Sequence, residues 1–134
     1  FMTARDWARF GELHRSDGVW DGRRILPEGW VHYVTTPTPK SPKGNYGAHW
    51  WLNAGTPPAA ADREWKKLPT DTYAAWGHSG QFVMVVPSAK LVVVRLGLSL
   101  PDGDDVGLED LVVESMRALG EEQAIPRNPE PVQH

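Results

Sequence analysis

The sequence contains no cysteine, so disulfide bridges, thiol nucleophiles and thiolate metal sites are all excluded within these 134 residues. An excess of basic charge is also lacking, because 14 Lys and Arg stand against 17 Asp and Glu, which gives a net charge of -3. Binding to nucleic-acid phosphates needs a basic face, so no nucleic-acid partner is expected. No apolar run approaches the ~20 residues of a membrane-spanning helix, and no signal-peptide pattern is visible.

The chain is rich in apolar and turn-forming residues instead. Hydrophobic residues make up 40% of it, which is enough for the core of one small domain. Seven Trp are many for this length, and 13 Gly with 12 Pro predict many turns. The five histidines are spread out without the i,i+4 pairing of zinc-binding helices, so we expect no metal and no other cofactor.

The spacing of apolar residues predicts an α+β fold. Thr3 followed by Asp6 is typical of a capping box, and it opens a helix that ends at 16–18. The other predicted elements are a tight turn over 20–23, a short strand with a helical turn entered at Pro27 over 25–31, strands over 46–53, 72–76, 81–86 and 91–96, and a helix over 108–119 capped by Asp104 or Asp105. We expect an antiparallel sheet of three or four strands flanked by helices in residues 1–122, and a flexible Pro-rich tail over 123–134.

Gly77-His78-Ser79-Gly80 separates two strand-forming segments. It matches neither a dinucleotide-binding nor a P-loop pattern. Glycines at such a place mark a bulge or hairpin corner, or they mark an edge strand whose bare backbone N–H groups bind a ligand. The residues alone favour the structural interpretation over the ligand-binding one.

Five segments in order resemble the class C β-lactamase-like serine hydrolases: 2–11 (MTARDWARFG), 22–31 (GRRILPEGWV), 46–52 (YGAHWWL), 73–81 (YAAWGHSGQ) and 91–96 (LVVVRL). That superfamily includes penicillin-binding proteins, esterases and 6-aminohexanoate-oligomer hydrolases. The chain looks most like the esterase and aminohexanoate-hydrolase branch. The resemblance implies that residues 1–122 form the C-terminal part of a β-lactamase/transpeptidase-like fold.

The nucleophile motif of that family, Ser-x-x-Lys, is missing here, since none of the six serines has a Lys three residues on. The second motif, Tyr-x-Asn or Ser-x-Asn, is missing too. In the family both motifs lie upstream of the helix that Thr3 opens. The resemblance therefore implies the C-terminal portion of a larger serine hydrolase, with no catalytic residue in this chain and no activity of the chain alone.

The third motif of the family, usually Lys-Thr-Gly or His-Thr-Gly, has two candidate registers. One reads His78-Ser79-Gly80 as the triplet and the N–H of Gln81 as the oxyanion-hole donor. The other reads Ala75-Trp76-Gly77, with the N–H of His78 as donor, and the spacing to the next strand favours it. It leaves Ala75 where the family carries Lys or His. The residues expected at the oxyanion hole and substrate pocket are His78, Gly77, Trp76, Ser79, Gly80 and Gln81.

The resemblance implies acyl transfer, in which an upstream Ser attacks an ester, amide or β-lactam carbonyl and water resolves the acyl-enzyme. The expected partners are the upstream part of the same enzyme and a small ester or amide substrate. The chain alone is expected to self-associate through its sheet edge and apolar surface. The family implies a bacterial cytoplasm or periplasm as the location. The alternative is a self-standing, non-catalytic binding module with a Trp-lined surface.

Overall fold

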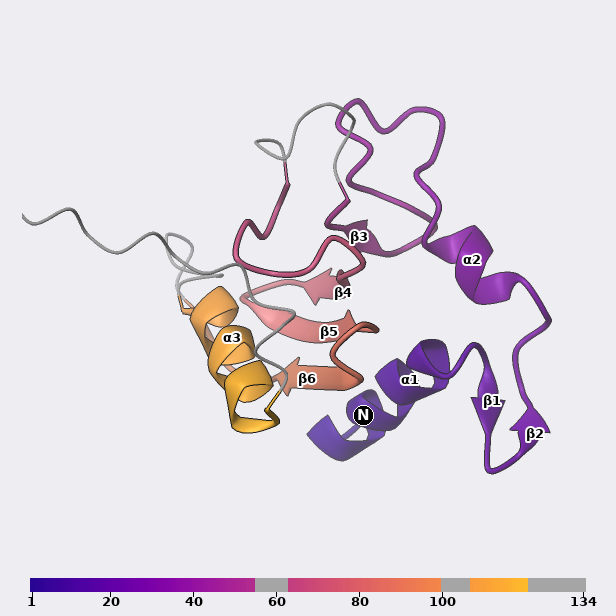
Figure 1. Ribbon diagram of the computed structural model, residues 1–134, viewed down its shortest axis with the longest axis horizontal. Coiled ribbons are helices and arrows are strands. Elements are labelled where there is room, and N and C mark those ends of the chain that lie inside the picture. The colour runs from indigo at the N-terminus through magenta and orange to yellow at the C-terminus, as the bar shows by residue number, and fades with distance from the viewer. Residues whose placement is uncertain (55–62, 100–106, 121–134) are drawn as a thin grey trace, which may run out of the picture.

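The computed structural model describes residues 1–54, 63–99 and 107–120. A four-stranded sheet lies at the centre, and the helices α1 and α3 lie on opposite sides of it (Figure 1). The elements are α1 (Ala4–Arg15), β1 (Val19–Trp20), β2 (Arg23–Arg24), α2 (Trp30–Val34), β3 (Trp51–Leu52), β4 (Tyr73–Gly77), β5 (Gln81–Val86), β6 (Leu91–Arg95) and α3 (Leu108–Ala118). The predicted α+β class is confirmed.

Helix α1 begins where the sequence predicts. The backbone N–H of Asp6 donates to the Thr3 hydroxyl at 3.2 Å, and the Thr3 N–H donates to the Asp6 carboxylate at 3.0 Å, which completes the capping box. The helix ends at the C-cap Ser16, after which Asp17 and Gly18 adopt positive φ values of 50° and 78°. A chain reversal therefore follows the helix directly.

The central sheet is antiparallel throughout, with the strand order β3-β4-β5-β6. The hairpin predicted between β5 and β6 is confirmed, with Val86 opposite Leu91. Its four-residue turn is closed by the Ala89 N–H, which donates to the Val86 carbonyl at 3.2 Å. Strand β6 ends at Arg95, one residue earlier than predicted.

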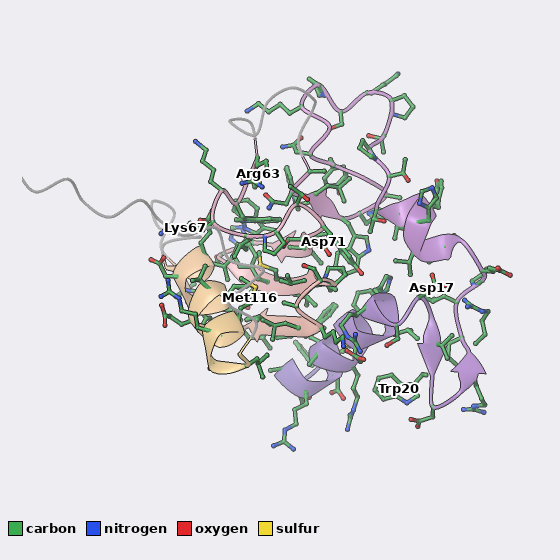
Figure 2. The ribbon with its side chains drawn as sticks, viewed as in Figure 1. Asp17, Trp20, Arg63, Lys67, Asp71 and Met116 are labelled. Atoms are coloured by element: carbon green, nitrogen blue, oxygen red, sulfur yellow. The ribbon has the colours of Figure 1, made fainter. Side chains whose placement is uncertain are left out.

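Strand alternation divides the core into two layers. One face of the sheet packs against α3, and Met116 of this helix lies between helix and sheet (Figure 2). The buried residues of this layer are Trp65, Leu68, Ala74, Phe82, Met84, Val86, Ala89, Leu108, Val112, Val113 and Met116. The opposite layer contains Val34, Trp50, Leu52, Tyr73 and Val85, with Phe10 of α1 packed against them. Both faces of the central strands are therefore covered.

Gly11 sets the distance between α1 and the sheet. A Cβ atom at this position would lie 2.6 Å from Cγ1 of Val92 and 3.0 Å from Cγ1 of Val83. Both distances are too short for ordinary side-chain contacts, so only glycine allows the helix to lie this close to β5 and β6. The low helix propensity of glycine is offset by this close packing.

The strand predicted over 46–53 is wrong in extent. Only Trp51–Leu52 forms a strand, and Tyr46 forms a single bridge with Trp51. The chain reverses between them, because His49 adopts a φ of 68°. The aromatic-rich composition of the segment predicts an extended conformation, but it carries no information about a left-handed residue inside that segment.

The prediction for residues 25–31 is also wrong in detail. The short strand is Arg23–Arg24, which pairs with Val19–Trp20 around the predicted turn, and Ile25 lies outside it. Helix α2 begins at Trp30, after Gly29 with a φ of 77°, and not at Pro27. The N-cap of α3 is Gly107 instead of an aspartate. Residues 104 and 105 and the predicted tail over 123–134 lie outside the described residues.

Candidate functional site

The glycine-containing segment forms the corner of a hairpin. Gly77 of β4 pairs with Gln81 of β5, and the three residues between them make the turn. Ser79 and Gly80 carry positive φ values of 58° and 76°, which reverse the chain within this short distance. The segment is therefore a hairpin corner, as the structural interpretation predicts. Whether it can also bind a ligand depends on the free backbone groups of the neighbouring strand β4.

Strand β4 has an unpaired edge next to this turn. Strand β3 covers only Tyr73 and Ala74, and the Asn53 N–H donates to the Thr72 carbonyl at 3.0 Å just before them. Backbone groups alternate in direction along a strand, so residues 72, 74 and 76 direct their N–H and C=O groups to the same side. Trp76 lies beyond the end of β3. Its backbone groups therefore point away from β5, toward an edge that no described strand occupies.

On the other strand of the hairpin, the hydrogen-bonding groups of Gln81 already have partners. The same alternation directs its backbone N–H toward Gly77, its partner in the register. Its side-chain oxygen accepts from the Gly97 N–H at 3.1 Å, and its Nε2 donates to the Gly97 carbonyl. Gln81 thereby fastens the segment after β6 to the β4–β5 turn, and both ends of its amide group are occupied.

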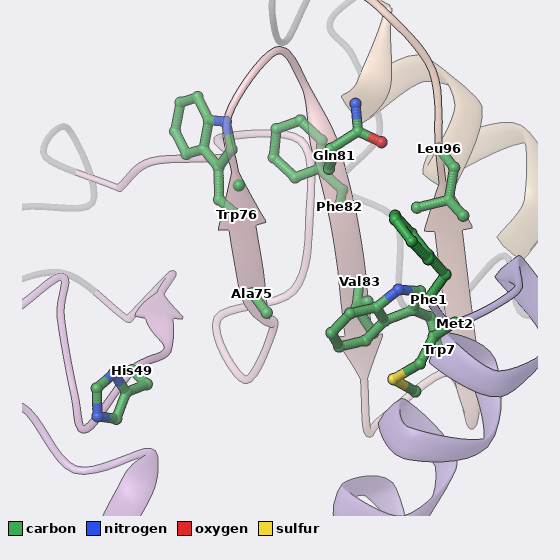
Figure 3. A pocket seen from close by; sticks show the side chains of 11 residues that line it. Phe1, Met2, Trp7, His49, Ala75, Trp76, Gln81, Phe82, Val83 and Leu96 are labelled. Carbon is green, nitrogen blue, oxygen red and sulfur yellow. The ribbon is translucent and has the colours of Figure 1, made fainter.

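An open pocket of about 510 Å³ lies beside the unpaired edge, as Figure 3 shows. Its walls come from the N-terminal end of α1, from the loop before β3, and from the ends of β4, β5 and β6. The lining residues are Phe1, Met2, Trp7, His49, Ala75, Trp76, Gly77, Gln81, Phe82, Val83 and Leu96. The structure thus brings three of the six predicted residues into one pocket: Trp76, Gly77 and Gln81. The turn residues His78, Ser79 and Gly80 are not among those that line it.

Sequence reasoning missed Trp7 and His49 as pocket residues. Trp7 has the spacing of the apolar face of α1, so its pattern predicts only a core residue. His49 reaches the pocket through the left-handed turn before β3, which no local sequence signal predicts. The only sequence feature that could have indicated this turn is the departure of the aromatic segment 46–52 from strict strand alternation.

A row of aromatic rings borders the unpaired edge. The ring of Trp76 stacks on Phe82 with a centroid distance of 5.1 Å and an interplanar angle of 28°. Trp51 lies 5.7 Å from Trp76, and Tyr46 lies 4.9 Å from Trp51. These contacts hold the indole of Trp76 on the face of the sheet that packs against α3, whereas Ala75 and Val83 lie on the face toward α1.

Charged side chains are absent from the described lining of this pocket, apart from the ionisable imidazole of His49. The nearest basic residue of β6, Arg95, donates to the Gly80 carbonyl and to the Ser99 hydroxyl, the latter at 2.6 Å. Its guanidinium group therefore stabilises the β4–β5 turn. The side chains that line the pocket are therefore largely apolar and include no Lys, Arg, Asp or Glu, and the α-amino group of Phe1 belongs to one of the lining residues.

Tyr73, at the opposite end of β4, has no suitable environment for base catalysis. Burial raises the pKa of its phenol, and the carboxylate of Asp71 raises it further. Only 5% of the residue is exposed, inside the layer under α1.

Within the ranges 1–54, 63–99 and 107–120, no group of three or more His, Asp or Glu could hold a metal ion, and no helix is long and apolar enough to cross a bilayer.

The fold resembles that of a protein of known structure. The chain superposes on "Putative 6-aminohexanoate-dimer hydrolase from Bacillus anthracis" with a TM-score of 0.57 and 22% sequence identity. The match covers 93% of this chain and 30% of that protein. This comparison establishes the similarity of fold.

A sequence relative of the same kind is a curated protein, the 6-aminohexanoate-dimer hydrolase of Paenarthrobacter ureafaciens. The two sequences are 28% identical over 113 residues, which cover 76% of this chain. The chain spans about a quarter of the relative's length, 25%. No family model matches the sequence. Together the two similarities confirm the predicted resemblance to the β-lactamase-like serine hydrolases.

Proposed function

We propose that this chain supplies the third-motif strand and the oxyanion-hole backbone of a serine hydrolase that cleaves ester, amide or β-lactam bonds through an acyl-enzyme. The observation that carries the proposal is the unpaired edge of β4 at Trp76, beside a neutral pocket. The nucleophile and its activating lysine come from a segment outside these residues, which fits the absence of Ser-x-x-Lys. The chain alone is then inactive.

The geometry of the hairpin supports the register with Ala75-Trp76-Gly77 as the triplet. The alternative register needs a free N–H at Gln81, but that group faces Gly77 across the hairpin. An N–H at position 78 has the same parity as Trp76 and so shares the direction of the open edge. His78 is also exposed, whereas Gly80 is buried.

In the proposed mechanism the serine attacks the substrate carbonyl and the developing oxyanion accepts hydrogen bonds from two backbone N–H groups. The His78 N–H is one of them, and removal of such a donor typically costs ~3 kcal/mol of transition-state stabilisation. Trp76 and Gly77 form the wall against which the substrate lies. Water then hydrolyses the acyl-enzyme and restores the serine.

The decisive experiment uses the protein encoded by the complete gene. Its sequence should contain Ser-x-x-Lys and Tyr-x-Asn upstream of Phe1, and a fluorophosphonate should label that serine. The 134-residue chain alone should not hydrolyse p-nitrophenyl esters or nitrocefin above background. Turnover by this chain with labelling of Ser79 contradicts the proposal.

A backbone substitution tests the register separately. Replacement of the His78 amide by an ester removes the N–H and should lower kcat about 10²–10³-fold in the complete enzyme. The matched ester at Gln81 weakens only the hairpin and should leave kcat within a few fold. The reverse result would assign the oxyanion donor to Gln81.

The second candidate function is a self-standing binding module, and the observation that favours it is the aromatic row from Tyr46 to Phe82. The experiments above distinguish the two. A complete gene without Ser-x-x-Lys, together with ligand binding by this chain, would support the binding module and exclude the hydrolase.

A further inference from the structure

The walls of the pocket beside β4 contain no Lys or Arg side chain, which a site that recognises a carboxylate usually supplies. We propose that this pocket binds a neutral ligand with an apolar acyl or alkyl chain and a carbonyl group, and that it excludes ligands whose head group is a carboxylate. The catalytic meaning of this selectivity rests on the proposed function, but the binding itself is a property of the described chain.

The first argument is electrostatic. None of the lining side chains is Lys or Arg, and Arg95 is held by Gly80 and Ser99. A carboxylate that leaves water without a cationic or multiply hydrogen-bonded partner is strongly disfavoured. Removal of a neutral carbonyl from water costs much less free energy, and the N–H groups at the open edge of β4 can donate to it. The pocket therefore discriminates at the head group of the ligand.

The second argument is the apolar surface that the pocket offers. Trp7 contributes an aromatic wall from α1, Val83 forms the floor on β5, and Leu96, which is 44% exposed, closes one side (Figure 3). A ligand chain that covers these side chains removes apolar surface from water on both partners. Each buried methylene raises affinity about fourfold. Affinity should therefore rise with the length of an unbranched chain.

Position 75 is the place in the pocket where a basic side chain could bind a carboxylate. The half-buried Ala75 lines the pocket on the face that carries Val83, and its small side chain leaves the adjoining space open. A lysine there would extend a flexible cationic chain into the same space. Ala75 thus serves as a specificity-determining residue, because the absence of a long basic side chain keeps the pocket neutral.

The test compares two ligands that differ only in the head group, hexanamide and hexanoate, at pH 8, where an imidazole is neutral. Binding is measured on the 134-residue chain with an acetylated N-terminus, which removes the charge of the Phe1 amino group from the pocket lining, and is followed by the shifts of the Trp indole N–H signals in ¹⁵N–¹H spectra. We expect hexanamide to bind at least tenfold more tightly than hexanoate and to shift Trp7 and Trp76. Butanamide, with two methylenes fewer, should bind about tenfold more weakly than hexanamide.

Substitutions at two sites provide the controls. Ala75→Lys should improve hexanoate binding at least tenfold relative to hexanamide, whereas the uncharged Ala75→Gln should keep the wild-type preference. Since all these proteins share the same acetylated Phe1 and the same His49, the difference isolates the charge at position 75. Trp7→Ala should lose hexanamide binding, and Trp30→Ala, at an exposed tryptophan of α2, should retain it.

Each outcome decides the proposal. Equal or tighter binding of hexanoate to the wild-type chain overturns it, and so does the absence of any shift at Trp7 and Trp76. An unchanged preference in a folded Ala75→Lys variant also overturns it. If hexanamide binds selectively but the complete protein has no reactive serine, the hydrolase proposal fails and this inference stands. If the serine is labelled but hexanoate is preferred, only this inference fails.

Discussion

Asn53 stabilises a long connection at the scale of a single residue. Its side chain is fully buried, and its Nδ2 donates to the carbonyls of Trp65, Leu68 and Pro69 at 2.9, 3.2 and 2.9 Å. Its Oδ1 accepts from the Trp65 N–H at 2.8 Å. One side chain therefore satisfies backbone groups of a segment that forms no regular structure, and it fixes Trp65 in the core.

Asn53→Asp should be severely destabilising. A carboxylate keeps the bond from the Trp65 N–H but cannot donate, so it faces three carbonyl oxygens and is buried as a charge. We expect the free energy of unfolding to fall by at least ~3 kcal/mol, measured by urea denaturation. The matched change Asn45→Asp, at a half-exposed asparagine, should cost far less. A small effect of Asn53→Asp would show that the segment 63–69 is not held as described.

His14 links stability to pH. The residue is 4% exposed, and its Nδ1 donates to the Phe10 carbonyl at 2.9 Å, with the ring packed against both Phe10 and Trp50. Burial lowers its pKa, because the protein interior disfavours the imidazolium ion. As the pH falls below the ordinary histidine value of about 6.5, the unfolded chain takes up the proton first.

The wild-type chain should therefore lose stability between pH 7.5 and 5.5, with a contribution from His14 of at most ~1.4 kcal/mol per pH unit. The lowered pKa values of the Asp6 and Glu12 carboxyls act only at lower pH, below about 4.5. His14→Gln should flatten the loss, and His32→Gln, at an exposed histidine, should not. Equal slopes for wild type and His14→Gln in urea titrations would contradict the assignment.

At the scale of the element, the contact of α1 with the sheet depends on a missing side chain. Gly11 faces Val92 and Val83 at distances that exclude a Cβ atom, and valine side chains have few rotamers with which to move aside. The helix propensity of alanine would stabilise an isolated helix by ~1 kcal/mol over glycine. Packing opposes that gain here.

Gly11→Ala should lower the free energy of unfolding by ~1–3 kcal/mol, because overpacking outweighs helix propensity. In the double variant with Val92→Ala the methyl group is accommodated, so the two changes should be less harmful together than the sum of each alone. Thermal denaturation of the four proteins of this cycle measures the coupling. Additive effects, or a more stable Gly11→Ala variant, would mean that α1 lies farther from the sheet.

At the scale of the whole molecule, the described residues leave both ends of the sheet incomplete. Strand β4 is open beyond β3, and β6 pairs only with β5 among the strands described. The pocket between them and α1 is lined by the exposed side chains of Met2 and Leu96 and by the half-buried Trp7. Open strand edges and contiguous apolar surface favour association.

We expect the isolated chain to self-associate at tens of micromolar, as measured by sedimentation velocity. Trp7→Glu should shift the distribution toward monomer by placing a charge in the apolar surface, and Trp30→Glu, on α2, should leave it unchanged. Addition of the upstream part of the proposed enzyme should replace the self-association. A monomer that binds no dye for apolar surface would indicate a complete domain.

The sequence by itself determined the features that depend on neighbours within a few residues. The capping box of Thr3 and Asp6, the β5–β6 hairpin and the amphipathic helix over 108–119 are fixed by local hydrogen bonds and by periodicity. The candidate site residues are of another kind, because the family resemblance and not local spacing predicts them. Of the six, Trp76, Gly77 and Gln81 line the pocket, and His78, Ser79 and Gly80 do not.

Only the tertiary structure decided which distant segments meet. It placed Trp7 and His49 in the pocket, buried Asn53 against residues more than ten positions away, and turned the chain at His49 where the aromatic-rich sequence predicts a strand. These features depend on packing between α1, the loop before β3 and the sheet, and the energy of such contacts outweighs local preference. The open edge of β4 has the same origin, because the length of its neighbour β3 decides which backbone groups stay free.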